Sequence, residues 1–229
     1  MTYAAELLEH AKNNLAWDKI RLGKFTASRL GDLMTSPRSK ASKDAGELSQ
    51  TAMTYVISRV MECATGQPAD EISSKYTDWG NEWEETALLK LAEAIECPTH
   101  KINLRPGFRM FNDYSGASPD AFMEFEGSTI GVEIKCPYNS VNHYYHSTIR
   151  NAEDLKAVNP QYYWQVQFNM LVFKMERWIF ASFDPRQPEN RILFWWVIEA
   201  NPEDMELACQ AIERAEDKKQ ELLKNWMHY

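Results

Sequence analysis

The chain has 229 residues, of which 44% are apolar and 12% aromatic, so it can bury a sizeable core and is not a disordered protein. Its 33 acidic residues outnumber 25 Lys and Arg and give a net charge of −8, which argues against a generic basic coat for nucleic acid. The longest apolar run, 192–198, is shorter than the roughly 20 residues of a membrane span, and no secretory signal opens the chain. We therefore expect a cytoplasmic protein with no membrane partner.

The pattern of apolar residues predicts elements in the following order. Helices are expected at about 3–17, 27–34, 50–64 and 79–96, then strands at about 107–112, 121–125 and 129–136, a helix at 160–175, strands at 178–183 and 192–198, and a helix at 202–226. Asn159-Pro160 and Asn201-Pro202 each supply a helix cap and a first-turn proline. Loops are expected at 36–47, which is basic, and at 65–77. This layout predicts an α/β or α+β fold, in one domain over residues 1–229, with helices around a mixed sheet.

Two carboxylates are predicted to face each other across a hairpin. Glu126-Gly127 lies midway between Asp120 and Glu133 and suits a two-residue turn. With the turn there, paired residue numbers sum to 253, and Asp120 is directly opposite Glu133, with their Cβ atoms about 5 Å apart. Lys135 projects from the same face as Glu133, because side chains alternate along a strand.

This grouping predicts a metal site of oxygen ligands. Two carboxylates this close repel each other, and a divalent cation between them removes the repulsion. Oxygen ligands favour Mg²⁺ or Mn²⁺ over zinc. Lys135 could orient or deprotonate a water, with its pKa lowered by burial and by the metal. These are the parts of phosphodiester hydrolysis, although an ordinary hairpin with a surface Glu–Lys pair is an equal alternative from the hairpin alone.

A further carboxylate comes from the predicted helix at 79–96. Glu84 falls on the same helical stripe as Ala87, Leu88 and Leu91, whereas Glu82 lies on the wet side. A carboxylate pointed inward needs a partner, and the metal site could supply one. The alternative is that Glu84 is favoured simply because it lies near a helix start.

At these residues the sequence resembles the phage lambda exonuclease family, the viral-recombinase branch of the PD-(D/E)xK nucleases. The matching stretches occur in the family's order and at similar spacing. They are Lys19-Ile20-Arg21-Leu22-Gly23, Thr26-Ala27-Ser28, Pro37-Arg38-Ser39, Trp79-Gly80 through Glu84, Ser118-Pro119-Asp120, Glu133-Ile134-Lys135-Cys136-Pro137, Gln165-Val166-Gln167 and Asp184-Pro185-Arg186. Ala121 departs from the family, which usually has Gly there, and the spacing from Asp120 to Glu133 is a few residues longer.

The resemblance implies a restriction-endonuclease-like core and a Mg²⁺-dependent 5′→3′ exonuclease that degrades one strand of double-stranded DNA to mononucleotides. It implies two ions per site, a homotrimeric ring and a single-strand annealing protein as partner in recombination. Asp120, Glu133 and the Ile134 carbonyl would bind metal, and Lys135 would serve the nucleophilic water. Glu84 and Gln165 would support the site. Arg21 and Ser28 match positions that hold the terminal 5′-phosphate of the DNA.

Elementary chemistry agrees with part of this assignment. Thr26 or Ser28 could cap the helix at 27–34, and Arg21 lies in a stretch, 19–43, with seven basic residues and one acid. A single arginine is nevertheless most often just solvated. Arg38 and the loop 65–77 are candidates for separating the two DNA strands.

The helix after Pro160 has a polar stripe. Tyr162, Gln165 and Asn169 share one face, which could lie against a nucleotide or simply face solvent. His143 and His146 are three residues apart, but with no evident third ligand they predict no metal site.

Three other functions compete with the exonuclease. An end-indifferent endonuclease would use the same metal core, and a catalytically silent DNA-end-binding or assembly module would need a broken metal set. A glycosidase would also use paired carboxylates, but Lys135 and the basic stretch 19–43 argue against it.

Overall fold

The structure is a computed structural model and describes residues 19–69 and 75–228. Its α-helices in this part are α2 (Leu30–Leu33), α3 (Lys40–Asp44), α4 (Gln50–Thr65), α5 (Lys75–Ala94), α6 (Ser140–His146), α7 (Ala152–Val158), α8 (Pro160–Phe173) and α9 (Pro202–Met227). Its strands are β1 (Phe25–Thr26), β2 (Asn103–Leu104), β3 (Arg109–Asn112), β4 (Ser115–Ala117), β5 (Ala121–Phe125), β6 (Ser128–Lys135), β7 (Arg177–Phe183) and β8 (Leu193–Glu199). Short 3₁₀ turns are η1 (Ala27–Arg29), η2 (Thr99–Lys101) and η3 (Glu189–Arg191).

The larger sheet is mixed and has the strand order β2-β5-β6-β7-β8. β6 and β7 run parallel, and the other neighbours are antiparallel. β5 pairs with β6 from Ala121 opposite Val132 to Phe125 opposite Ser128, so the predicted register is confirmed. The turn residues Glu126 and Gly127 both have positive φ, 51° and 76°, as a two-residue hairpin of this kind requires. The hairpin register thereby sets which side chains share a face.

A smaller sheet has the order β1-β4-β3, in which β1 runs parallel to β4 and β4 antiparallel to β3. β1, β2 and β4 are two or three residues long and were not predicted. Segments this short carry no periodicity, so the sequence pattern could not reveal them.

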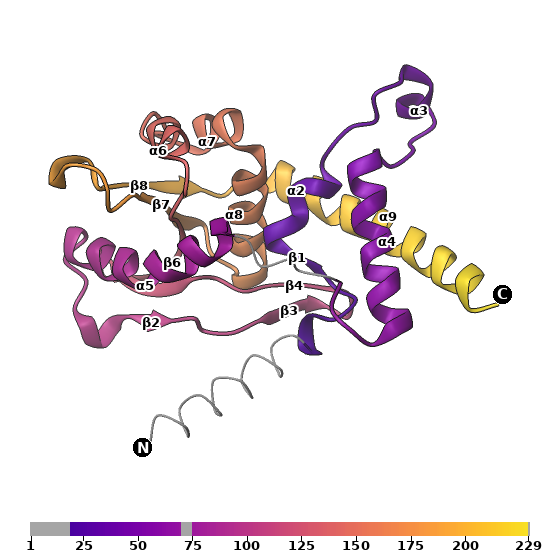
Figure 1. Cartoon of the computed structure of the whole chain (residues 1–229), viewed down its shortest axis with the longest axis horizontal. Helices are drawn as coiled ribbons and strands as arrows, with labels where there is room; N and C mark the ends of the chain where they lie inside the picture. Colours follow the sequence, from indigo (N-terminus) through magenta and orange to yellow (C-terminus); the bar gives the residue numbers. More distant parts are fainter. Residues whose placement is uncertain (1–18, 70–74, 229) are drawn as a thin grey trace, which may run out of the picture.

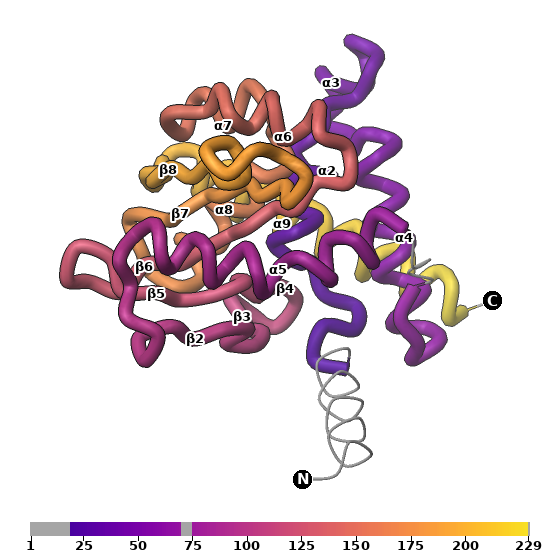
Figure 2. Tube along the Cα trace, turned by 60° about the vertical axis from the view of Figure 1, so that its left-hand side comes forward, coloured from indigo at the N-terminus to yellow at the C-terminus, as the bar shows by residue number. Residues whose placement is uncertain are grey.

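Helices cover both faces of the larger sheet. The apolar stripe of α5, which includes Leu88 and Leu91, packs with Met123, Val132 and Ile179 of the sheet, and Figure 2 shows α5 lying across β5 and β6. On the other face α8 lies between the sheet and the helices α2 and α9, within a second core cluster. α4 packs along α9, which extends towards the C-terminus (Figure 1). The expected mixed sheet with flanking helices is confirmed.

Most of the predicted elements are present, with some differences at their ends. α5 begins four residues before the predicted start, and the basic loop 36–47 contains the short helix α3. The caps at Asn159 and Asn201 are confirmed, because their side chains accept hydrogen bonds from the N–H groups of Tyr162 and Asp204. The predicted helix 3–17 lies outside the described residues. No helix in the described part of the chain is long and apolar enough to cross a membrane.

The predicted helix at 27–34 is instead the 3₁₀ turn η1 followed by the single helical turn α2. The expected caps are also wrong. Thr26 precedes η1 without a side-chain cap bond, and the exposed Ser28 hydroxyl lies 3.2 Å from the Thr26 hydroxyl. The Thr26 N–H donates to the ring hydroxyl of Tyr55 at 2.9 Å, and the backbone departs from helical geometry at Arg29 (φ −117°, ψ 8°), between η1 and α2.

Gly131 makes room for a large core side chain. Its strand neighbour Trp178 is fully buried, and a Cβ at position 131 would lie 2.2 Å from the indole ring. We predict that Gly131→Ala lowers the free energy of unfolding by roughly 1–3 kcal/mol, because the ring cannot move without disturbing the core. Urea denaturation measures this change.

Gly80→Ala is the matched control, because a Cβ at position 80 of α5 meets no atom within 4 Å. That substitution should leave stability unchanged or raise it by up to about 1 kcal/mol through helix propensity. Equal stability of the two variants would contradict the packing argument.

Candidate active site

The end of the β5–β6 hairpin brings the two predicted carboxylates together. The Asp120 carboxylate accepts a hydrogen bond from the Ile134 N–H at 2.7 Å, and the Asp120 N–H donates to the Val132 carbonyl at 3.3 Å. Asp120 is therefore held beside β6, at the level of Glu133, as the register requires.

Glu133 is a buried anion, with only 1% of its surface exposed. Three side chains compensate its charge. Lys135 Nζ lies 2.5 Å from Oε1, Gln165 Nε2 donates to Oε1 at 2.6 Å, and Asn169 Nδ2 donates to Oε2 at 3.1 Å. An unpaired carboxylate at this depth would be costly, so these three contacts stabilise the fold.

The polar stripe of α8 thus faces the site and not solvent. Gln165 and Asn169 are buried, and both donate to Glu133. The Tyr162 ring lies under the Lys135 ammonium, with Nζ 4.8 Å from the ring centroid. Val166 and Met170, on the opposite face of α8, are buried in the core. Tyr162 therefore contacts the site lysine, while its predicted contact with DNA stays a prediction.

Glu84 lies on the side of the site formed by α5. Its side chain is 23% exposed and accepts a 3.0 Å hydrogen bond from Arg105 Nε. The predicted stripe is confirmed, because Ala87, Leu88 and Leu91 are buried and Glu82 is exposed.

Arg105 is the residue that sequence reasoning missed. Its backbone N–H donates to the Asp120 carbonyl at 2.8 Å, and its side chain holds Glu84. Its φ of 48° is in the left-handed region, which a non-glycine residue rarely adopts. Contacts 15 and 21 residues away in sequence depend on the fold, and the only local signal is the turn-forming Pro106-Gly107 that follows.

Asp120 and Lys135 affect each other's pKa, and Glu133 affects both. Burial and repulsion from Glu133 raise the pKa of Asp120 well above its usual range, against the attraction of Lys135. Burial alone would lower the pKa of Lys135, but Glu133 and Asp120 hold it above its ordinary value. The expected lowering by burial is therefore wrong for the protein side chains by themselves. A cation that takes up the carboxylate charge would be needed to lower it.

The donor set fits a hard divalent cation. Asp120, Glu133 and the Ile134 carbonyl supply oxygen atoms only, which suits Mg²⁺ or Mn²⁺. Burial and repulsion from Glu133 raise the pKa of Asp120, and such an ion would offset both effects. No group of three or more His, Cys, Asp or Glu in the described ranges is arranged as a metal cluster, and Glu84 is turned towards Arg105.

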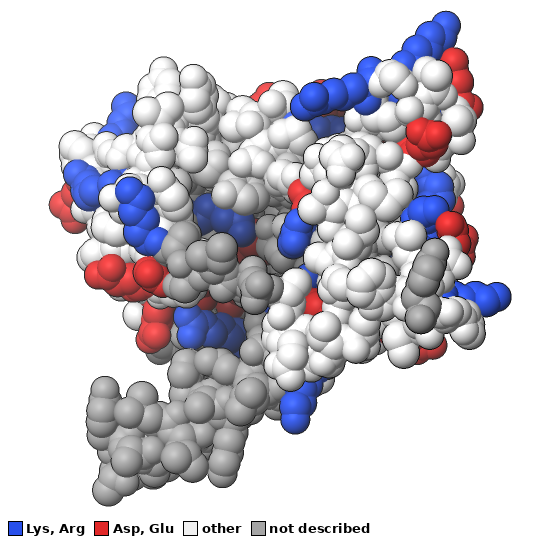
Figure 3. Space-filling view, turned by 45° about the vertical axis from the view of Figure 1, so that its right-hand side comes forward, with Lys and Arg blue, Asp and Glu red and all other residues white. Residues whose placement is uncertain are grey.

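Three of the candidate DNA-binding residues, Arg21, Ser28 and Arg38, lie on the N-terminal part of the chain, whereas Tyr162 lies on α8. Arg21 and Ser28 flank Gly23, whose N–H and carbonyl are held by Glu62 at 2.7 Å and by Lys219 at 2.9 Å. Arg38 is exposed just before α3. On the face shown in Figure 3, Lys and Arg side chains form separate groups among uncharged and acidic surface. This distribution agrees with local basic sites on an acidic protein.

The comparisons with known proteins decide the family. The model of the YqaJ-like viral recombinase domain matches residues 16–176, which is more than half of the chain. The chain belongs to the YqaJ-like viral recombinase family. No curated protein sequence matches it.

Solved exonuclease structures share the fold. An alkaline exonuclease from Laribacter hongkongensis superposes with a TM-score of 0.73 at 21% identity, over 93% of this chain and 96% of that one. Its complex with dAMP gives 0.74 at 24% identity, with the same coverage. A phage-related exonuclease from Haemophilus somnus 129PT gives 0.72 at 19% identity, over 89% of this chain and 96% of that one. The resemblance stated from the motifs is confirmed, and family and fold together support a nuclease.

His143 and His146 have structural roles. Both Nδ1 atoms lie within 3.0 Å of the Ser182 hydroxyl, and His143 Nε2 lies 2.8 Å from the Arg191 carbonyl. Burial, His143 and Lys135 lower the pKa of His146 to about 4, so His146 is neutral at pH 7. The pair fastens α6 to β7 and to the turn before β8.

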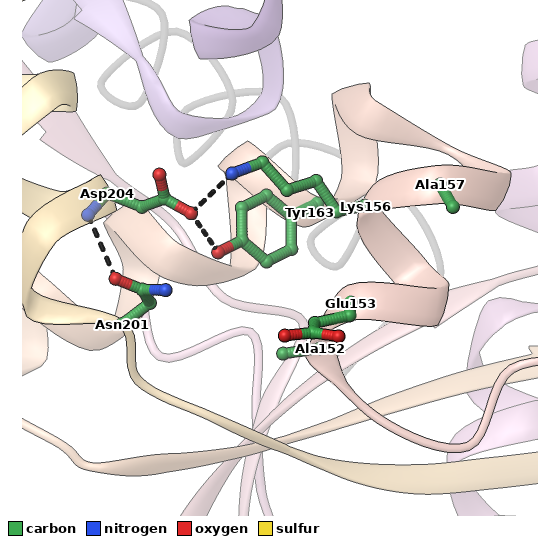
Figure 4. Close-up of a pocket in the computed structure, with 7 residues that line it drawn as sticks. All are labelled: Ala152, Glu153, Lys156, Ala157, Tyr163, Asn201 and Asp204. Atoms are coloured by element: carbon green, nitrogen blue, oxygen red, sulfur yellow. Dashed lines mark hydrogen bonds and ion pairs between the residues drawn. The ribbon is translucent and has the colours of Figure 1, made fainter.

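A pocket of about 410 Å³ lies between α7 and the starts of α8 and α9, apart from the candidate active-site residues (Figure 4). Of its two carboxylates, Glu153 and Asp204, the second already contacts Lys156 at 2.6 Å and the Tyr163 hydroxyl at 2.5 Å. Burial, together with the bond to Asp204, raises the pKa of Tyr163. None of the predicted site residues lines this pocket, and its polar groups serve to join three helices.

The titration of Asp120 predicts how stability depends on pH. Because the folded pKa of Asp120 is raised, its carboxyl group lowers the free energy of unfolding as the pH rises above its unfolded pKa of about 3.9, and this cost is absent in acid. Asp120→Asn should therefore stabilise the metal-free protein, and the gain should grow as the pH rises from about 4. Urea denaturation in EDTA measures it.

Urea denaturation without EDTA tests the metal site. Mg²⁺ at about 100 times its dissociation constant should raise the unfolding free energy of the unmutated protein by about 2.7 kcal/mol. Asp120→Asn should lose this gain, whereas a surface control, Lys101→Ala, should keep it. Unmutated protein that neither Mg²⁺ nor Mn²⁺ stabilises would contradict the assigned ligands.

Proposed function

We propose that the protein is a Mg²⁺-dependent 5′→3′ exonuclease that acts on the ends of double-stranded DNA. It would release mononucleotides and leave a 3′ single strand for recombination by strand annealing. The observation that carries this proposal is the convergence of Asp120, Glu133 and Lys135 at the end of one hairpin, with Glu84 alongside. The residues 1–229 would act as one nuclease domain.

Each side chain has a distinct task in the proposed reaction. Bound divalent cations, two per site, would neutralise the phosphodiester charge and activate water. Asp120, Glu133 and the Ile134 carbonyl would hold them, with Mn²⁺ able to substitute. Lys135 would orient the attacking water and give or take its proton, while Gln165 fixes the orientation of Glu133 through their 2.6 Å hydrogen bond.

Glu84 and Arg105 form a further part of the site. In the metal-free protein Arg105 neutralises Glu84 at 3.0 Å, so this carboxylate is kept close to Asp120 without adding full repulsion. On DNA binding, a phosphate group would compete for the Arg105 guanidinium and release Glu84 towards the cations.

The end of the DNA would be recognised through the turn around Gly23. Arg21 and Ser28 would hold the terminal 5′-phosphate, and Arg38 and Tyr162 would contact the strand. Since η1 and α2 are each only three or four residues long, they would contribute little helix dipole to phosphate binding, and Arg21 would supply most of the charge.

Assembly and partners follow from the same proposal. A homotrimeric ring would enclose the duplex, and a single-strand annealing protein would receive the 3′ strand. The dAMP in the structure of the Laribacter exonuclease is a deoxynucleoside monophosphate, the kind of product proposed here.

One digestion experiment separates the competing functions. Linear duplex labelled at each end, and closed circular duplex, are incubated with and without Mg²⁺. Loss of label from the 5′ end of linear DNA alone supports the proposal. Cleavage of the circle would show an end-indifferent endonuclease, and DNA-end binding without cleavage would show a silent module.

We predict that Lys135→Ala lowers the cleavage rate by roughly 10²–10⁴-fold, the range for a positioned acid–base group, with DNA binding retained. Lys135→Gln is the companion variant, because it keeps an N–H donor for the buried Glu133 and so protects the fold. Single-turnover cleavage and a binding assay measure the two quantities. If binding falls as much as cleavage, Lys135 is a phosphate anchor instead.

We also predict a preference for 5′-phosphorylated ends. A terminal phosphate carries nearly one more negative charge than an internal one, and a guanidinium exploits that difference. Arg21→Ala should reduce the rate on phosphorylated duplex about 10- to 100-fold, since such bonds contribute roughly 1.5–3 kcal/mol, and should erase the preference. Equal rates of the unmutated protein on phosphorylated and hydroxyl ends would remove Arg21 from this role.

A further inference from the structure

Three aromatic rings and two cations gather at the start of α5 and the end of β6. The Tyr138 ring lies edge-on to Tyr76 and Trp79, with centroids 5.2 and 5.8 Å apart. Lys75 Nζ is 5.1 Å from the Tyr138 centroid, and the Arg186 guanidinium is 4.6 Å from the Trp79 centroid. These five residues are called the aromatic–cation cluster below.

The aromatic–cation cluster adjoins the candidate active site. Tyr138 follows Lys135 by three residues, and Trp79 precedes Glu84 by five residues on α5.

Arg186 is fixed in place before any ligand binds. Its guanidinium makes two hydrogen bonds, of 2.7 and 3.1 Å, to the buried carboxylate of Asp184 and a third, of 3.2 Å, to the Pro137 carbonyl. Ser140 and Gln187 donate to the same carboxylate. The arginine and the Trp79 ring beneath it therefore form a rigid base for the cluster.

The outer rings are open to solvent. Tyr76 is 58% exposed and Tyr138 38% exposed, although both are large aromatic side chains. Exposed aromatic rings interleaved with cations match an unpaired nucleic-acid strand, whose bases stack on rings and whose phosphates attract Lys and Arg.

We propose that the aromatic–cation cluster is a stacking site for the unpaired nucleobases of single-stranded DNA next to the cleavage site. A base would replace Lys75 on the Tyr138 face, and Lys75 would turn to a neighbouring phosphate. The inference rests on the proposed function, because it needs a DNA strand at the active site.

The test measures binding without cleavage. The probe is a 5′-phosphorylated oligo-dT strand in EDTA, compared with a strand of equal length whose sites are abasic. Stacking on one ring is worth roughly 5- to 150-fold in affinity per base. We expect Tyr76→Ala and Tyr138→Ala each to weaken oligo-dT binding about 10-fold and to leave abasic-strand binding unchanged. Phe in place of either tyrosine should preserve affinity, because the ring remains.

Tyr144→Ala is the matched control, because Tyr144 is a 67% exposed tyrosine on α6 outside the cluster. It should not alter binding. Equal losses on the oligo-dT and abasic strands, or an equal loss from Tyr144→Ala, would overturn the proposal. So would a change in oligomeric state of the cluster variants in sedimentation, since the rings would then form a contact between copies of this chain.

The failure of this inference can be told apart from failure of the proposed function. If the unmutated protein cuts linear duplex with Mg²⁺ but the cluster variants bind both strands normally, only the stacking site is wrong. If the unmutated protein cuts no DNA under any of these conditions, the proposed function itself falls.

Discussion

A buried carboxylate in the middle of a sheet is the constraint from which the site and part of the core follow. Glu133 is almost fully enclosed, so its charge must be met by donors from the surrounding elements. Lys135 from its own strand and Gln165 and Asn169 from α8 meet it. This requirement explains why α8, which is otherwise buried in the core, carries two amides on the face turned to β6.

The hairpin could be predicted from sequence because local chemistry determines it. Glu126-Gly127 defines the turn, the register follows by counting, and Asp120 is then placed opposite Glu133. The same reasoning could not find the contact between Arg105 and Glu84. That contact depends on the packing of α5 against the sheet and on a left-handed residue before Pro106, which no periodicity encodes.

The segment 23–34 is a part of the chain where the local sequence pattern alone did not predict the structure. The pattern at 27–34 predicts one helix, whereas the structure has the 3₁₀ turn η1 and the short helix α2, with non-helical backbone angles at Arg29 between them. Just before η1, the Thr26 N–H donates to the Tyr55 hydroxyl of α4, and Gly23 is held by Glu62 and Lys219, residues 39 and 196 positions away. The position of Arg21 therefore depends on hydrogen bonds from two helices that sequence reasoning treated as unrelated to it.

The charges of the site are only partly balanced by its own side chains. Asp120 and Glu133 repel each other, and Lys135 partly compensates both charges. Arg105 compensates the charge of Glu84. The balance is incomplete, because the pKa of Asp120 remains raised. The fold therefore retains an electrostatic cost that core packing must outweigh, and the apolar stripe of α5 supplies part of that packing. Because the same helix carries Glu84, the packing that stabilises the sheet also places the third carboxylate, so any loss of the α5 contacts should weaken the fold and the site together.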